Sequence, residues 1–316
     1  MPTKFRKLVT DRLSDSRKGK LLQQRARARF ALHKLLGKDS GNELVASTIA
    51  PIFVIGTNRS GASVCTLMLS KHPEIEGIFQ GVETSHQIGA SGHAANRVEA
   101  NHIWRSLARP DFDITQGESI LWGLPESISR VYIGSVSEGE KRQLIDELLA
   151  ARATTKIPLV MNSHNVFRIP LIKGLFPEAR FVLMTRDHES FIKSGKHKWT
   201  TDREVGVLGP DSYIDYPHIG LHWLLINAIA LYDLKKYAPA DYIHIKLQDL
   251  HGTAVERTEI INRVFGFLGL DSIEMLDDVF DDGFIFTRSE GSGEIDVLSL
   301  LVNNLFDYEN GLDQPD

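Results

Sequence analysis

The sequence predicts a three-layer α/β fold, in which helices cover both faces of a mostly parallel sheet. Two observations carry this prediction. Short apolar runs that suit buried strands alternate along the chain with segments whose apolar residues recur at helical spacing. The first of these strands runs into a glycine-rich turn and then into a helix, an order of elements that can build an anion-binding site. The chain of 316 residues is long enough to enclose a full α/β core.

Each expected element has a simple signature in the sequence. Four strands are expected where short runs of apolar and β-branched residues occur, at 52–55, 158–161, 180–185 and 242–245. Six helices are expected from the spacing of apolar residues, at 62–70, 138–153, 169–176, 189–197, 221–237 and 254–268. Glycines and scattered polar residues predict loops and short helices over 76–135, and Asp, Gly and Pro predict an exposed loop over 200–217. Such loops often carry substrate contacts.

The charge distribution divides the chain into a basic extension over residues 1–45 and a single domain over 46–316. The first 40 residues contain twelve Lys or Arg and three Asp, whereas the remainder contains 24 basic and 38 acidic side chains. An acidic domain argues against broad nucleic-acid binding. The extension predicts a helix over 20–37 that packs on the domain or on a second subunit. Alternatively, this helix lies on an anionic membrane surface or meets an acidic partner.

Composition favours a cytoplasmic protein. The apolar fraction of 42% suits a globular chain, and no stretch approaches the roughly 20 apolar residues that span a bilayer. The basic N-terminus lacks the apolar core of a secretory signal. The single cysteine, Cys65, cannot form an internal disulfide and falls on an apolar helix face. We therefore expect Cys65 in the core of a protein from a reducing compartment.

The turn after the first strand, Gly56-Thr57-Asn58-Arg59-Ser60-Gly61, is close in spacing to a Walker A loop. The lysine that would reach the β- and γ-phosphates is replaced by Ala62, and the loop carries Arg59 instead. Backbone amides, Arg59 and the hydroxyls of Ser60 and Ser63 suit a 5′-phosphate or a phosphosulfate better than ATP. The plainer interpretation is a strand-to-helix turn that needs its glycines for backbone reasons.

A second group of anion-binding side chains follows the strand over 180–185. Arg186 stands at the carboxyl end of this strand, where ligands bind in open α/β sheets, and Ser194 lies two helical turns further on. A guanidinium fork and a hydroxyl suit a terminal phosphate dianion. Alternatively, Arg186 pairs with Asp187 or with a helix end.

Both segments resemble the sulfotransferase family. IFVIGTNRSGASVCTLMLSKHPEI, over residues 52–75, is similar to its 5′-phosphosulfate loop, and FPEARFVLMTRDHESFIKS, over 176–194, is similar to its 3′-phosphate element. Segments 245–250 and 267–270 also resemble the family. The sequence departs from the family pattern at four positions, Ala62, Val64, Asn162 and His188, where threonine, leucine, lysine and proline are usual.

This resemblance implies a P-loop-containing nucleotide-binding fold and 3′-phosphoadenosine 5′-phosphosulfate as the donor. It assigns the 5′ end of the donor to the loop residues Arg59, Ser60, Gly61, Ala62, Ser63 and Val64. It assigns the 3′-phosphate to Arg186 and Ser194. Arg288 falls in a glycine-rich stretch that is similar to the loop that covers the nucleotide in many members of the family, although a plain surface turn fits this stretch as well.

Transfer of a sulfuryl group to a hydroxyl or amine needs stabilisation of charge on the leaving oxygen and a general base. Arg59 and the loop amides can supply the charge stabilisation. Two residues are equal candidates for the base. His164 follows the strand over 158–161, and Glu83 comes shortly after the first helix, a position that loosely matches the glutamate used in other branches of the family. His86 is a third candidate. A leaving phosphate requires no metal, and no metal-binding motif such as H-E-x-x-H is present.

Two other classes of function fit parts of the pattern. One is a P-loop kinase or another nucleotide enzyme, which Ala62 at the lysine position disfavours. The other is a sulfotransferase-like protein that binds nucleotide or a partner without catalysis, which Ala62, Asn162 and His188 keep open. We expect a small-molecule, glycan or lipid acceptor, although composition does not separate a lipid, a glycan, a natural product or a peptide.

Overall fold

The computed structural model describes residues 49–78, 100, 104, 136–152, 154–204 and 216–274. Within these residues a five-stranded sheet has the order β2-β3-β1-β4-β5, and every neighbouring pair is parallel. The strands are β1 (Ile52–Gly56), β2 (Ile75–Gly77), β3 (Ile157–Met161), β4 (Arg180–Thr185) and β5 (Tyr242–Lys246). Because all strands run the same way, the turns that follow β1, β3 and β4 emerge at one edge of the sheet.

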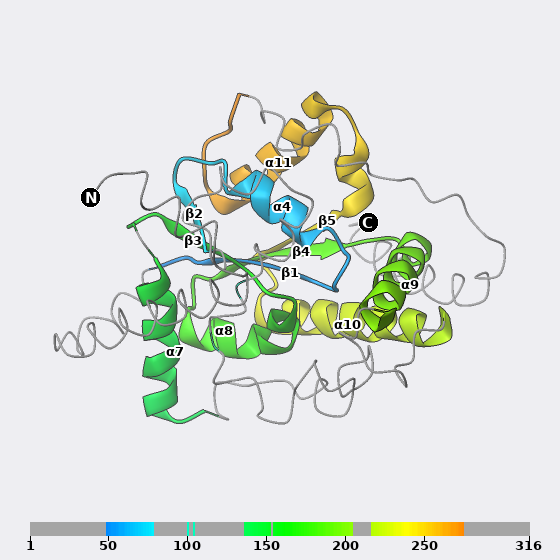
Figure 1. The fold of residues 1–316 in the computed structure, drawn as a ribbon. Helices are drawn as coiled ribbons and strands as arrows, with labels where there is room; N and C mark the ends of the chain where they lie inside the picture. The colour runs from blue at the N-terminus through cyan, green and yellow to red at the C-terminus, as the bar shows by residue number, and fades with distance from the viewer. Residues whose placement is uncertain are drawn as a thin grey trace, which may run out of the picture.

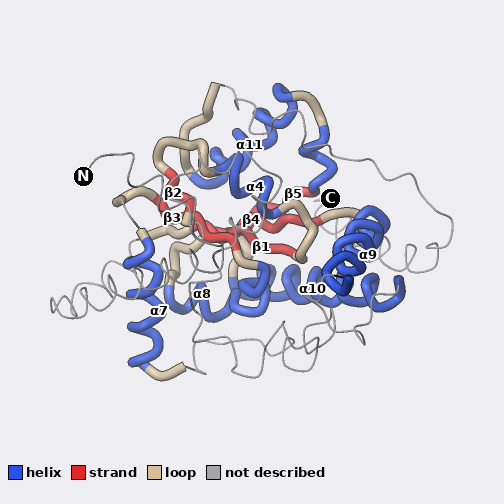
Figure 2. Tube along the Cα trace, in the orientation of Figure 1, coloured by secondary structure: helices blue, strands red, loops and turns tan. Residues whose placement is uncertain are grey.

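Helices cover both faces of the sheet, which confirms the predicted three-layer α/β fold (Figure 1). Figure 2 shows the sheet between an upper layer of α4 and α11 and a lower layer of α7, α8 and α10, with α9 beside one end of α10. The helices are α4 (Ala62–Leu69), α7 (Glu138–Ala151), α8 (Ile169–Leu175), α9 (His188–Glu204), α10 (Tyr216–Tyr237) and α11 (Ala254–Leu268), with short 3-10 helices η5 (Ser163–Arg168) and η6 (Leu247–His251). No described helix combines the length and apolarity needed to cross a bilayer.

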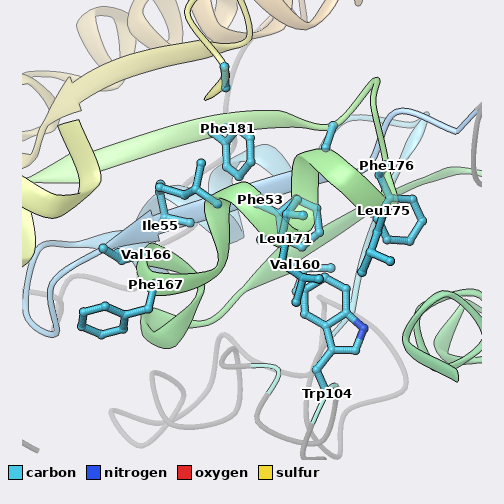
Figure 3. Close-up of a cluster of buried hydrophobic side chains, with 14 of the residues drawn as sticks. Phe53, Ile55, Trp104, Val160, Val166, Phe167, Leu171, Leu175, Phe176 and Phe181 are labelled. Atoms are coloured by element: carbon cyan, nitrogen blue, oxygen red, sulfur yellow. The ribbon is translucent and has the colours of Figure 1, made fainter. Parts of the chain in front are cut away.

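The sheet separates two apolar clusters, and successive residues of β1 point alternately into one cluster and then the other. Phe53 and Ile55 pack towards α7, α8 and α10, in the cluster shown in Figure 3, whereas Ile52 and Val54 pack towards α4 and α11. β1 is buried along its whole length, as expected of a central parallel strand. Cys65 is fully buried in the upper cluster, as predicted, and burial raises the pKa of its thiol to about 12.

The predicted strands and helices match the structure within a few residues at most boundaries, and the differences have physical causes. The edge strand β2 lies in a region predicted to be loop, because three residues are too few to show a strand pattern. η5 and η6 were not predicted, since 3-10 turns lack a long periodicity.

The predicted exposed loop over 200–217 is wrong at both ends. α9 continues to Glu204, and α10 begins at Tyr216, five residues before its predicted start. The two helices pack together through an aromatic cluster, defined here as Phe191, Trp199, Ile219, His222 and Trp223. This tertiary packing extends both helices beyond the segments that their own periodicity indicates.

Candidate anion-binding site

The turn between β1 and α4 is shaped by three residues with positive φ. Gly56 has φ 151°, Arg59 has φ 71° and Gly61 has φ 88°. A β-carbon at Gly56 would lie 2.2 Å from the carbonyl oxygen of Met184, and one at Gly61 would lie 2.4 Å from Leu247 Cδ1. Glycine is therefore required at Gly56 by space and by backbone conformation, and it is favoured at Gly61 by the positive φ. Ser60 N donates to Thr57 O at 3.1 Å and closes the turn.

The first turn of α4 presents backbone donors to the same space. Its N-cap, Gly61, has no side chain to accept from the first amides, and no side chain caps the helix. Ala62, Ser63 and Val64 occupy the first three helical positions, so their N–H groups and the positive end of the helix dipole face the loop. Such donors suit an anion.

Two hydroxyls in the turn are buried without a hydrogen-bond partner among the described residues. They are Ser60 Oγ and Thr57 Oγ1, in side chains that are 0% and 3% exposed. Buried hydroxyls of this kind normally have a hydrogen-bond partner, so these two can still bond to a further group. Thr57 was not predicted as a site residue. Its position inside the glycine turn was the signal that could have found it.

The turn after β4 places Arg186 beside the first turn. Arg186 Nη1 donates to the carbonyl oxygen of Arg59 at 3.4 Å, and Arg186 Nε is buried without a partner among the described residues. Burial lowers the pKa of Arg186, Asp187 raises it, and Arg59 lowers it further.

The Asp187 carboxylate accepts hydrogen bonds from residues other than Arg186, so the hydrogen bonds do not support the alternative pairing of Arg186 with Asp187. Asp187 Oδ1 accepts from Ser190 N at 2.7 Å, near the start of α9, and Oδ2 accepts from the side chain of Gln248 in η6. Trp223 Nε1 also donates to Arg186 O at 2.8 Å. These contacts hold the backbone of the turn and leave the Arg186 side chain directed at the loop.

Ser194 completes the group. Arg59 Nε donates to Ser194 Oγ at 3.1 Å, across 135 residues of sequence. The structure therefore brings together Arg59, Arg186 and Ser194, and the loop residues Ser60 to Val64 lie beside them. Leu247 of η6 packs against Gly61, and His188 begins α9 with its ring edge-on to Trp223 at 6.0 Å between centroids.

Of the two candidate bases, the structure describes the backbone position of His164, whereas Glu83 lies outside the described residues. His164 is the second residue of η5, which follows β3, and its position along the chain places it at the same sheet edge as the loop after β1. Asn162 directly precedes η5 and is 5% exposed. Glu83 and Arg288, together with His86 and the extension over 1–45, lie outside the described residues, so their roles stay predictions. No three His, Cys, Asp or Glu side chains gather as a metal site in the part of the chain that the structure describes.

Comparison with known proteins identifies the class. A profile of the sulfotransferase family matches residues 51–273, which include both turns and the strands that carry them. A search of proteins with curated descriptions finds no significant match.

Solved structures of sulfotransferases are similar to this chain at low sequence identity. A sulfotransferase domain from the curacin biosynthetic pathway is 14% identical, with a TM-score of 0.42 over 82% of this chain and 86% of that chain. A sulfotransferase from Mycobacterium avium is 13% identical, with a TM-score of 0.47 over 78% and 71%. One from Alicyclobacillus acidocaldarius is 14% identical, with a TM-score of 0.46 over 82% and 92%.

The chain therefore belongs to the sulfotransferase family. This assignment rests on the family match over most of the chain, and it makes the protein a sulfotransferase enzyme.

Proposed function

We propose that the protein transfers a sulfuryl group from 3′-phosphoadenosine 5′-phosphosulfate to a hydroxyl or amine of an acceptor. One observation carries the proposal. Three buried polar atoms without partners among the described residues, Ser60 Oγ, Thr57 Oγ1 and Arg186 Nε, lie on two turns that the hydrogen bond from Arg186 Nη1 to Arg59 O joins. A ligand with an anionic group at each end would satisfy both turns at once.

The residues present fit such a donor, which supplies an activated sulfuryl group. The amides of Ala62, Ser63 and Val64, with the hydroxyls of Thr57 and Ser60, would hold its 5′ end. Arg186 and Ser194 would hold its 3′-phosphate. Loss of the usual threonine hydroxyl at Ala62 removes one contact and leaves the backbone donors in place, so we expect weaker donor binding rather than none.

The Arg59 side chain can reach both the 3′ side and the 5′ side of the proposed site. In the structure its Nε donates to Ser194, on the 3′ side of the proposed site. Its positive φ of 71° and exposed side chain keep it at the rim of the loop, where it can also stabilise negative charge on the 5′ side. We propose that Arg59 contributes to binding in the first position and to charge stabilisation in the second.

A base must take the acceptor proton. His164 and Glu83 remain the two candidates, and separate alanine substitutions distinguish them. The base is the residue whose loss abolishes turnover while the affinity for adenosine 3′,5′-bisphosphate is retained. If both variants keep full turnover, neither residue is the base.

A thermal titration tests the donor directly. Adenosine 3′,5′-bisphosphate should raise the melting temperature well beyond equal concentrations of ATP or AMP, because neither of these carries a phosphate at both ends of the nucleoside. A preference for ATP would instead support a kinase. Tight bisphosphate binding without transfer of labelled sulfate to any acceptor would support a binding protein without catalysis.

The acceptor and the cellular setting follow as further proposals. We expect a small-molecule, glycan or lipid acceptor and a cytoplasmic location, and a screen of acceptors with labelled donor is the experiment that narrows the first. For residues 1–45, deletion tests whether the basic extension binds vesicles that contain anionic lipid. Unchanged vesicle binding would remove the membrane proposal and leave packing on the domain or on a second subunit.

A further inference from the structure

Arg168 is a buried cation that the donor site does not use. It ends η5 and occupies the N-cap position of α8, where its side chain caps no backbone amide. The residue is only 7% exposed. An arginine at this depth is normally paired with a carboxylate, because an unpaired buried charge is costly.

Its hydrogen bonding is incomplete. Within the described residues, Arg168 makes one side-chain hydrogen bond, from Nη1 to Asn165 Oδ1 at 3.3 Å, and no ion pair. Burial lowers the pKa of Arg168 to about 10, and no carboxylate of the described residues offsets this shift. Among the described residues, only one of the five N–H donors of this guanidinium group has a hydrogen-bond partner.

Asn165 adds a donor of the same kind. The residue is 1% exposed, its Oδ1 accepts from Arg168, and its Nδ2 is buried without a partner in the part of the chain described. The groups of Arg168 and Asn165 that have no partner among the described residues are all N–H donors, and they surround a positive charge. A group that satisfies it must offer acceptor oxygens and negative charge, which is the chemistry of an oxyanion.

The pair lies on η5, which follows β3 at the sheet edge where the donor loop also emerges. η5 follows β3, contacts β1, and packs against α10. Figure 3 shows Val166 and Phe167 of η5 beside Ile55, the residue that precedes Gly56 of the donor loop. The pair thus lies on the α8 and α10 side of the sheet, on a different turn from the residues assigned to either end of the donor.

We propose that Arg168 and Asn165 form a subsite for an oxyanion carried by the acceptor, such as a carboxylate or a phosphate ester. This inference rests on the proposed function. It narrows the acceptor to molecules that combine the reacting hydroxyl or amine with a negatively charged group.

The first test measures binding without turnover. The full chain, saturated with adenosine 3′,5′-bisphosphate, is titrated with benzoate, phenyl phosphate and neutral benzamide while its melting temperature is followed. The two anions should raise the melting temperature in a saturable way, and benzamide should not. The Arg168→Met variant should bind the anions at least about tenfold more weakly, a loss typical of one charged hydrogen-bonded contact.

Arg263→Met is the matched control, because Arg263 is an exposed arginine on α11, on the opposite face of the sheet. It should retain the anion response. Equal responses in the wild type and Arg168→Met, or no response to either anion, would overturn the proposal. A larger response to one anion identifies whether a carboxylate or a phosphate ester is preferred.

The bisphosphate response separates this inference from the proposed function. Arg168→Met should keep the wild-type shift with adenosine 3′,5′-bisphosphate. A lost shift in this variant alone would assign Arg168 to the donor and end the acceptor proposal. An absent shift in the wild type would instead end the proposed donor site.

Stability without ligand gives a second, independent readout. If Arg168 awaits a ligand, Arg168→Met replaces an unpaired buried charge by an apolar chain of similar length, and the melting temperature should rise by a few degrees. If a carboxylate elsewhere in the chain pairs with Arg168, the same variant should melt at a lower temperature, which also contradicts the proposal.

Discussion

The two turns that form the candidate donor site are built in opposite ways. The turn after β1 depends on absent side chains, since Gly56 and Gly61 allow backbone conformations and close contacts that any β-carbon would disturb. The turn after β4 depends on additional side chains. Ser190 of α9 and Gln248 of η6 donate hydrogen bonds to the Asp187 carboxylate, and Trp223 of α10 donates one to Arg186 O, so three elements hold this turn.

The two turns therefore contribute different kinds of hydrogen-bond donor to the site. The first turn offers backbone amides and buried hydroxyls, whose placement follows from local geometry. The second offers a guanidinium group, whose long side chain has to be oriented by the surrounding fold. The first turn should therefore be sensitive to small local changes, whereas the second should be sensitive to the packing of α9 and α10.

The largest expected effect comes from the first turn. Gly56→Ala would place a β-carbon 2.2 Å from Met184 O, at a backbone φ of 151° that alanine rarely adopts. Strain and overpacking together should reduce the free energy of unfolding by about 4 kcal/mol. Urea denaturation measures this change.

Gly139→Ala provides the control for that substitution. Gly139 lies in α7, and a β-carbon added there would meet no atom within 4 Å, so alanine should stabilise the protein by about 0.5 to 1 kcal/mol. Similar effects of the two substitutions would contradict the account of the first turn.

Acid should weaken the support of the second turn. Burial between Phe191 and Trp199 lowers the pKa of His222 to about 4, against about 6.5 in the unfolded chain. The unfolded state therefore binds more protons between these values. The stability that His222 contributes is fully present above pH 6.5 and is lost as the pH falls to 4, a change of roughly 3 kcal/mol.

The comparison of His222→Phe with the wild type checks this expectation. Unfolding free energies are measured in urea at pH 7 and pH 4.5, and the variant should lose less stability on acidification. His244, whose pKa burial also lowers to about 4, is unchanged in both proteins and provides the common background. An identical loss in the two proteins would show that the His222 ring does not control the acid response.

Removal of the second turn's cation should reduce discrimination between nucleotides. Arg186→Gln should weaken binding of adenosine 3′,5′-bisphosphate about 100-fold, because a charged hydrogen-bonded contact to phosphate is lost. AMP, which has no 3′-phosphate, should be affected little. Titration calorimetry with both ligands measures the ratio, and an equal loss for AMP would move Arg186 to the 5′ end of the site.

The smallest expected effect tests the bracing of the second turn. Trp223→Phe removes the 2.8 Å hydrogen bond to Arg186 O and keeps an aromatic ring in the cluster. Bisphosphate affinity should fall about fivefold, as expected for one neutral hydrogen bond of about 1 kcal/mol. An unchanged affinity would show that Asp187 and Gln248 hold the turn without Trp223.

Much of the fold could be predicted because its elements are locally encoded. β4 and α11 have the predicted bounds, since an apolar run in one and a capped amphipathic pattern in the other are complete within their own residues. α9 and α10 were predicted too short because their extra turns depend on the aromatic cluster between them. β2 escaped prediction because it is short and is stabilised by its pairing with β3.

The class of the fold, the glycine turn and the residue types that suit an anion at two strand ends could all be predicted from the sequence. Three further facts follow from tertiary contacts alone: Arg59 and Ser194, 135 residues apart, share a hydrogen bond, Thr57 has a buried hydroxyl without a partner among the described residues, and Arg168 is a buried cation. The physical reason is that strand and turn propensities act over a few neighbouring residues. Burial and hydrogen-bond satisfaction depend on which distant segments the parallel sheet brings to the same edge.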